Sequence, residues 1–126
     1  MTGALAEVWV LEDDEEFREL LEEVLTTPRV RVTPFERAQD VLQQLSDAPP
    51  PDVLVTDHHL EGVHGLDLVA GLRARGFTAP VLLVTAFADA DLRRRARDLS
   101  DVEVVEKPCD VLALRRRVRD RLGDLR

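Results

Sequence analysis

Polar and charged side chains stand at the ends of several short apolar runs in this sequence. Each of the following lies at the end of such a run or within two residues of it: Glu12, Asp13, Asp57, Thr85 and Lys107. Three carboxylates gathered at one place repel one another and need a counter-charge. An all-oxygen cluster of this kind suits a hard divalent ion such as Mg²⁺.

This set of groups indicates phosphoryl transfer to a side chain. Mg²⁺ takes only one or two protein carboxylates beside phosphate oxygens and water, which leaves a third carboxylate free to act as a nucleophile. A nearby Lys107 and the metal would neutralise the phosphoryl oxygens in the transition state. A hydroxyl such as that of Thr85 could then bind the transferred group.

The apolar runs themselves predict the strands of a parallel sheet. Three of them lack polar alternation, which is typical of strands covered on both faces, whereas the second run alternates and is expected at an edge. The five expected strands are Glu7–Leu11, Val30–Thr33, Asp52–Thr56, Val81–Thr85 and Val102–Val105.

The segments between and after these runs have helical periodicity. Apolar residues at helical spacing form five stripes: Phe17, Leu20, Leu21, Val24 and Leu25; Ala38, Val41, Leu42 and Leu45; Leu66, Val69, Ala70 and Leu72; Leu92, Ala96 and Leu99; Val111, Leu114, Val118 and Leu122. Five strands alternating with helices predict a doubly wound α/β sandwich. Ligands of such folds bind beyond the carboxyl ends of the strands, so the polar residues should converge on one rim.

Length and composition limit the remaining possibilities. The 126 residues suit one domain (1–126, with its core at about 7–122), and 44% hydrophobic with 33% charged residues is typical of a soluble chain. A net charge of −8 disfavours direct nucleic-acid binding, and the single Cys109 excludes an internal disulfide. There is no long apolar run and no basic leader, so we expect a cytoplasmic protein with no membrane span.

Charge is distributed unevenly along the chain. Residues 1–70 hold 4 basic and 16 acidic side chains, whereas residues 71–126 hold 13 basic and 9 acidic ones. The arginine runs at 93–97 and 115–121 are explained most simply as solvated helix faces, with a basic partner-docking surface as the rival interpretation. The glutamates of 15–23 are likewise expected to form a solvated face.

Four segments together resemble the receiver domain of two-component response regulators: VLEDDEEFRELL (10–21), DVLVTDHHLEGVHGLDL (52–68), APVLLVTAF (79–87) and VVEKP (104–108). The intervals fit that family, with 44 positions from Asp13 to Asp57, 28 from there to Thr85 and 22 more to Lys107. The resemblance extends from about Glu7 to Leu122. It implies a flavodoxin-like, five-stranded parallel sheet with strand order 2-1-3-4-5.

The resemblance also implies roles for the acidic residues. Asp57 would be the phosphoacceptor and a metal ligand, and Glu12 and Asp13 would be the acidic pair. Asp13 would bind Mg²⁺ directly and Glu12 often through water. The main-chain carbonyl of His59 would be a third ligand.

Further roles concern the switch and the partners. Thr85 would be the switch hydroxyl, and Lys107 would hold the phosphoryl group, followed by a commonly cis Pro108. The phosphoryl group would come from a histidine kinase or a phosphotransfer protein. The added charge would rearrange the fourth helix, fifth strand and fifth helix, where the family commonly dimerises or binds an output domain or protein. With no output segment after Leu122, the sequence suggests a single-domain regulator or a receiver taken from a longer protein.

Several positions depart from the family pattern. Val104 stands where an aromatic residue is usual, Ser100-Asp101 replaces a small pair, and Cys109, Glu61 and His64 replace Phe, Pro and Asp. The residues expected to carry out phosphoryl transfer match the family pattern, whereas the positions that usually respond to phosphorylation differ. We therefore predict that the effect of phosphorylation is transmitted in a non-standard way.

Two alternatives to a phosphoacceptor receiver domain remain. The first is a pseudo-receiver, which would use the same fold without phosphoryl transfer. An aspartate-nucleophile phosphatase would be an enzyme rather than a regulatory domain, but it usually carries Asp-x-Asp after its first strand, and here Asp57-His58-His59 follows the third. Adjacent histidines in an extended or turn segment point in different directions, which argues against a transition-metal site at His58, His59 and His64. His59 and Phe87 both lie two places beyond a site residue and are predicted to flank the water that hydrolyses the phosphoryl group.

Overall fold

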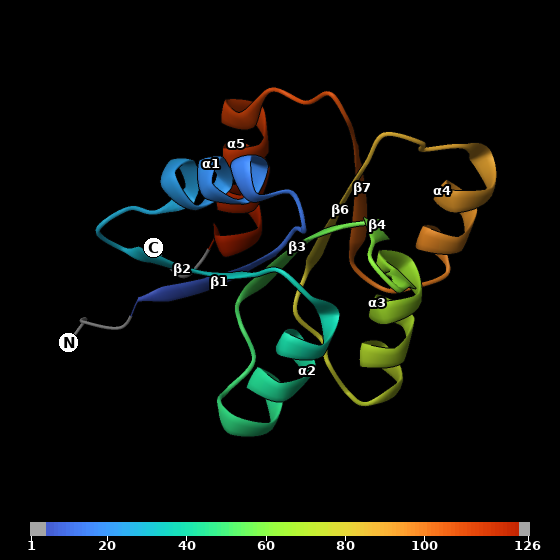
Figure 1. The fold of residues 1–126 in the computed structure, drawn as a ribbon, viewed down its shortest axis with the longest axis horizontal. Coiled ribbons are helices and arrows are strands. Elements are labelled where there is room, and N and C mark those ends of the chain that lie inside the picture. The colour runs from blue at the N-terminus through green and yellow to red at the C-terminus, as the bar shows by residue number, and fades with distance from the viewer. Residues whose placement is uncertain (1–4, 124–126) are drawn as a thin grey trace.

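Parallel strands with helices on both faces make up the chain (Figure 1). A computed structural model describes residues 5–123. In chain order the elements are β1 (Ala6–Leu11), α1 (Glu15–Leu25), β2 (Val30–Phe35), α2 (Ala38–Asp47), β3 (Val53–Asp57), β4 (His59–Leu60), β5 (Val63–His64), α3 (Gly65–Ala74), β6 (Val81–Thr85), α4 (Ala90–Arg97), β7 (Val102–Glu106) and α5 (Val111–Leu122).

The main sheet confirms the predicted topology. Within the described residues it has five parallel strands in the order β2-β1-β3-β6-β7, which is order 2-1-3-4-5 when these five strands alone are numbered. The uninterrupted apolar runs are the three central strands, and the alternating run is the edge strand β2. Pro34 lies in β2 opposite Val10, a position that an edge strand tolerates because its outer side needs no ladder hydrogen bond.

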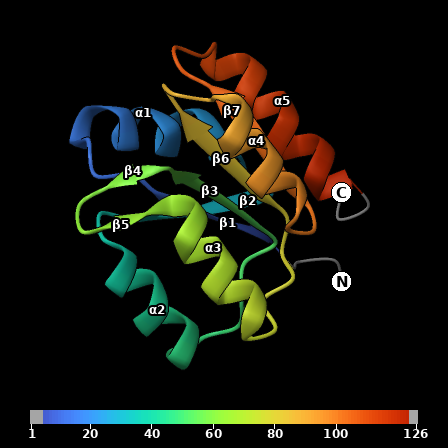
Figure 2. The same ribbon diagram turned by 90° about the vertical axis from the view of Figure 1, so that its right-hand side faces the viewer.

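Two layers of side chains cover the two faces of the sheet. Helices α1 and α5 pack on one face over Val8, Val10 and Val55, while α2 and α3 pack on the other over Trp9 and Leu54. Figure 2 shows this division, with α1 and α5 on one side of the sheet and α2 and α3 on the other. Trp9 is a core residue, as expected, with its ring 5.1 Å from that of Phe35.

Two features differ from the expected elements. Leu20 belongs to the apolar stripe of α1 by spacing, yet it is 41% exposed because α1 turns Leu21 and Leu25 toward the sheet instead. A small antiparallel hairpin, β4–β5, follows β3 and was not predicted. Its turn contains Gly62 at φ +84°, a conformation that favours glycine.

No helix within residues 5–123 combines the length and the apolar character that crossing a membrane would require.

Candidate functional site

The carboxyl ends of the central strands bring three acidic side chains together. Glu12 and Asp13 directly follow β1, and Asp57 is the last residue of β3, the strand paired beside it. One carboxylate oxygen from each of the three lies within 4.8 Å of the others, and no other such group of three possible metal ligands occurs among residues 5–123. Because parallel strands all end at the same edge, residues 44 positions apart meet there.

Lys107 reaches the same place from the end of β7. Its Nζ lies 3.2 Å from Glu12 Oε1 and 3.6 Å from Asp57 Oδ2. The ammonium also stands 4.9 Å from the ring centre of Phe17, in the first turns of α1. Lys107 is the only lysine in the sequence, so one ammonium group faces three carboxylates.

Burial sets the electrostatics of this pocket. The Glu12 side chain accepts a hydrogen bond from the Asp14 backbone N–H at 3.1 Å, and the residue is only 2% exposed. Burial raises the pKa of Glu12, and the neighbouring charge of Asp57 raises it further, although the hydrogen bond from Asp14 and the charge of Lys107 act in the opposite direction. Three carboxylates carry more negative charge than one lysine can balance. A hard divalent cation binds such ionised oxygen donors, so the residues fit Mg²⁺.

Thr85 lies beside this group, at the end of β6. The residue is fully buried, and its Oγ1 accepts a hydrogen bond from the Phe87 backbone N–H at 3.1 Å. Its carbonyl accepts a second bond from the Lys107 N–H at 2.7 Å, which ties the ends of β6 and β7 together. Within residues 5–123 no hydrogen bond joins the Thr85 hydroxyl to the carboxylates. The Lys107–Pro108 peptide bond is cis, as the resemblance implies.

Comparison with known proteins explains this arrangement. The family model for the response regulator receiver domain matches residues 8–119. The chain belongs to the response regulator receiver domain family. It is 34% identical to the DNA-binding transcriptional regulator NtrC of Escherichia coli (strain K12) over 104 residues, which is 82% of this chain and 22% of that protein. It is also 34% identical to the transcriptional regulatory protein FixJ of Azorhizobium caulinodans, over 92% of this chain and 54% of that protein.

Solved structures agree. A CheY-like response regulator receiver domain from Methylobacillus flagellatus superposes with a TM-score of 0.79 at 27% identity, covering 94% of this chain and 99% of that one. This receiver domain therefore spans about a fifth of the length of NtrC and about half that of FixJ.

The three histidine rings of this receiver domain lie close together. The rings of His58 and His64 stack with their centres 5.0 Å apart, and that of His59 lies 5.0 Å from His58 and 6.0 Å from His64. The β4–β5 hairpin causes this, because it pairs His59 directly with His64. The planes of the adjacent His58 and His59 rings differ by 73°, and within residues 5–123 the group of possible metal ligands contains no histidine.

His58 has a structural role at the start of α3. Its Nδ1 accepts the Leu66 N–H at 3.2 Å, whereas the N-cap residue of the helix, His64, makes no side-chain cap hydrogen bond. Burial lowers the pKa of His58, and the charges of His59 and His64 lower it further. A neutral ring is what this hydrogen bond requires, since a protonated Nδ1 cannot accept.

His59 and Phe87 meet above the site. Their rings are perpendicular with centres 5.4 Å apart, and Phe87 is 70% exposed. The His59 backbone N–H also donates to Asp57 Oδ1 at 3.3 Å. His59 and Phe87 are thus each tied through the backbone N–H to a site residue, Asp57 and Thr85 respectively.

Sequence reasoning missed the contribution of Gly65. A Cβ at this position would lie 2.2 Å from the Asp57 carbonyl oxygen and 2.9 Å from the His58 Cα. The Gly65 N–H donates to the His58 carbonyl at 2.7 Å. A glycine directly before the predicted apolar stripe that begins at Leu66 was the available signal, but it does not reveal which backbone lies opposite.

Proposed function

We propose that this receiver domain accepts a phosphoryl group on Asp57 and thereby controls a protein-interaction surface. The proposal rests on one observation: three carboxylates and the only lysine of the chain, from three different strand ends, meet in one pocket. The donor is a histidine kinase or a phosphotransfer protein, by analogy with the regulators of this family.

In the transfer, an Asp57 carboxylate oxygen attacks the phosphorus of a phosphohistidine. The new O–P bond forms as the P–N bond breaks, and the imidazole nitrogen keeps the electron pair and takes a proton from water. The buried position of Asp57 limits its hydration, and Lys107, 3.6 Å from Oδ2, is placed to balance the incoming phosphoryl charge.

Glu12, Asp13, Asp57 and the main-chain carbonyl of His59 are the residues that we propose to hold Mg²⁺, with Glu12 acting through water. When bound, Mg²⁺ supplies positive charge to the phosphoryl oxygens. Glu12 also orients Lys107 through their 3.2 Å contact.

The readout begins at Thr85. If its hydroxyl turns to bind the phosphoryl group, the Phe87 N–H loses its acceptor, and the segment before α4 must rearrange. We propose that this change reaches the surface of α4, β7 and α5, where an output domain or protein would bind. Val104 on β7 is small and half-buried, so the change passes through the backbone rather than through a moving aromatic ring.

The test is incubation with acetyl phosphate and Mg²⁺, followed by intact-mass measurement. We expect a species heavier by about 80 Da in the wild type and none in Asp57→Ala. Absence of that species in the wild type would favour a pseudo-receiver. Turnover of a free phosphomonoester would favour a phosphatase.

The lifetime of the adduct tests the border residues. We propose that His59 and Phe87 restrict the water that hydrolyses the phosphoryl group, because their rings contact each other and their backbone N–H groups bond to Asp57 and Thr85. His59→Asn and Phe87→Ala should each change the rate at which the heavier species decays. An unchanged decay rate in both would reject this role.

A further inference from the structure

Helix α5 carries all of its charge in one short segment. The helix contains five arginines and one aspartate, a formal charge of +4, and these residues all lie between positions 115 and 121. A hollow of about 620 Å³ lies on this part of the helix, within the usual size range of small-molecule sites. It is lined by Ala113, two acidic residues and four arginines: Arg116, Arg117, Arg119 and Arg121. Four cations and two anions give its wall a net formal charge of +2.

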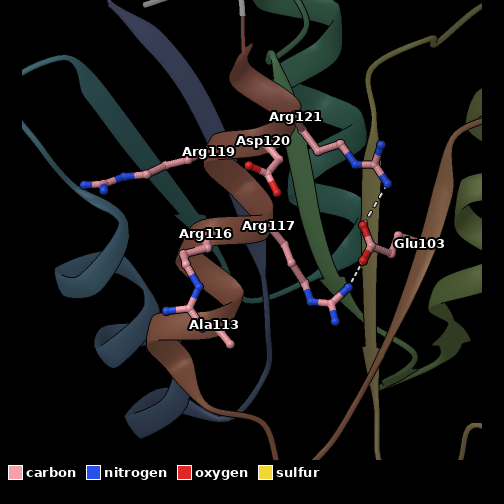
Figure 3. Close-up of a pocket in the computed structure, with 7 residues that line it drawn as sticks. All are labelled: Glu103, Ala113, Arg116, Arg117, Arg119, Asp120 and Arg121. Atoms are coloured by element: carbon pink, nitrogen blue, oxygen red, sulfur yellow. Dashed lines mark hydrogen bonds and ion pairs between the residues drawn. The ribbon is translucent and has the colours of Figure 1, made fainter.

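Two of these arginines already hold an anionic group of the chain. Arg117 and Arg121 are turned toward Glu103 of β7, and both pair with its carboxylate (Figure 3). Arg121 also lies 3.5 Å from the carboxylate of Asp101, just before β7. A guanidinium group matches carboxylates and phosphates because its donors form a planar fork. The pairs with Glu103 therefore show that arginines of this segment can converge on one oxyanion.

The other two lining arginines are unpaired. Arg116 and Arg119 extend away from Glu103 in Figure 3, and neither has an acidic partner within residues 5–123. Both residues are exposed. Residues three positions apart are neighbours on a helix surface, so the two guanidinium groups can reach one ligand together. Their donors are therefore available to an anion from outside the chain.

The chemistry of the hollow favours phosphate groups over other ligands. A phosphate group carries nearly two negative charges and three strong acceptor oxygens, whereas a carboxylate carries one charge and two oxygens. One or two phosphate groups therefore balance the net charge of the wall. Apart from Ala113 and the stems of the arginines, the wall offers no apolar side chain and no aromatic ring. A ligand that is held mainly by hydrophobic contacts does not fit such a site.

We propose that this hollow of α5 binds a soluble ligand with at least two linked phosphate groups, such as pyrophosphate or a nucleoside diphosphate. Arg116 and Arg119 make the first contacts, because they are unpaired within the described residues. Arg117 and Arg121 complete the site when the phosphates draw them from Glu103. The hollow shares no residue with the pocket around Asp57, so it is a second site for phosphate chemistry.

Ligand binding would change the connection between α5 and β7. Glu103 ties β7 to α5 through its pairs with Arg117 and Arg121, and a phosphate that takes over either guanidinium group weakens this tie. Both elements belong to the surface on which we propose that an output domain or protein binds. The ligand would therefore be a second input to that surface, beside phosphorylation. This consequence rests on the proposed function, whereas the binding itself does not.

Titration with pyrophosphate, followed by amide NMR spectra of the unphosphorylated full chain without Mg²⁺, tests the proposal. The amide signals of α5 and of Glu103 should shift, with a dissociation constant below about 1 mM at low salt. Orthophosphate should bind at least about tenfold more weakly, because it reaches fewer guanidinium groups. A parallel titration with ADP distinguishes the two sources of the ligand. Equal affinity would mean that the phosphates alone are recognised, and tighter binding would mean that the nucleoside is recognised too.

Substitutions on the two sides of the hollow should have opposite effects. Arg116→Gln/Arg119→Gln should raise the dissociation constant for pyrophosphate at least about tenfold, because it removes two charge-assisted contacts. Glu103→Gln should lower it about two- to fivefold, because it releases the two arginines that pair with this carboxylate. The matched control is Arg75→Gln/Arg97→Gln, which removes the same charge at two exposed arginines outside α5 and should bind pyrophosphate like the wild type.

Three results would overturn the proposal: no binding of pyrophosphate at about 1 mM, shifts confined to amides around Asp57 and Lys107, or a control that loses affinity as much as Arg116→Gln/Arg119→Gln does. Tighter binding of citrate or of a glutamate-rich peptide than of pyrophosphate would also overturn it, because the hollow would then serve carboxylates. Asp57→Ala should bind pyrophosphate on α5 like the wild type. Failure of this proposal is therefore distinguishable from failure of the phosphorylation proposal.

Discussion

Replacing Gly65 by alanine should both destabilise the fold and impair the site. The added Cβ would stand 2.2 Å from the Asp57 carbonyl oxygen and 2.9 Å from the His58 Cα, whereas comfortable contacts are about 3.5 Å. Both opposing atoms belong to the backbone, so no side chain can rotate to relieve the overlap. The segment must therefore separate, at a cost of about 1–3 kcal/mol or more.

Gly71 provides the matched control in the same helix. A Cβ at Gly71 would meet nothing within 4 Å among the described residues, and alanine has the higher helix propensity. Gly71→Ala should therefore stabilise the protein by roughly 0.5–1 kcal/mol. The two identical chemical changes, six positions apart in one helix, should have opposite signs.

Urea unfolding followed by circular dichroism gives both free energies. At roughly 3–6 °C per kcal/mol for a domain of this size, the melting temperatures of the two variants should differ by about 5–20 °C. Gly65→Ala should also accept a phosphoryl group from acetyl phosphate more slowly, because the displaced backbone is that of Asp57. A Gly65→Ala protein as stable and as rapidly phosphorylated as Gly71→Ala would refute the close approach.

Three further outcomes are expected. In the absence of Mg²⁺ at pH 7, Glu12→Gln should be more stable than the wild type, because a buried acid with a raised pKa opposes folding when it is ionised. The difference in the free energy of unfolding between the two proteins should shrink as the pH falls toward 4.5. Added Mg²⁺ should stabilise the wild type more than the variant. A less stable Glu12→Gln in urea titrations would contradict this. His58→Ala should cost about 1 kcal/mol at pH 7.5 by removing the acceptor of the Leu66 N–H. Because burial lowers the pKa of His58, the contribution of this residue to stability is complete above about pH 6.5, the pKa of an unfolded histidine, and is lost as the pH falls through the lower pKa of the folded state. The difference in the free energy of unfolding between His58→Ala and the wild type should therefore narrow toward about pH 5. Phosphorylation should accelerate hydrogen exchange at the Phe87 amide, and Thr85→Ala should show that faster exchange without phosphorylation; a protected amide in Thr85→Ala would contradict the proposed readout.

The sheet and the meeting of the acidic residues were predictable because both depend on short-range patterns. Uninterrupted apolar runs marked β1, β3 and β6 as central strands, and the polar residue after each run lies where parallel strands end. Strand order came from the resemblance to receiver domains, because the handedness of the crossovers does not by itself fix it. Glu12, Asp57 and Lys107 could then be placed at one edge of the sheet from the strand ends alone, without knowing the conformation of the loops.

The rest depends on geometry that residue types do not encode. Two-residue strands such as β4 and β5 are too short for periodicity to reveal, so the hairpin and the convergence of the histidines were missed. The exposure of Leu20 depends on how α1 is rotated about its axis against the sheet. Spacing alone defines a broad apolar stripe and does not say which of its residues face the sheet. The close approach at Gly65 depends on the hairpin and could not be foreseen without it.

Lys107 connects the site with the first turns of α1. Its ammonium contacts Glu12 and Asp57 on one side and the Phe17 ring on the other. Phe17 belongs to α1 and packs against the core cluster that also includes Val111 of α5. A phosphoryl group on Asp57 would add negative charge on one side of the ammonium only, drawing it from the ring and loosening the first turns of α1. The proposed phosphorylation and the packing of α1 are thus linked through one side chain, and the direction of the link follows from charge: whatever strengthens the hold of the pocket on Lys107 weakens its contact with α1.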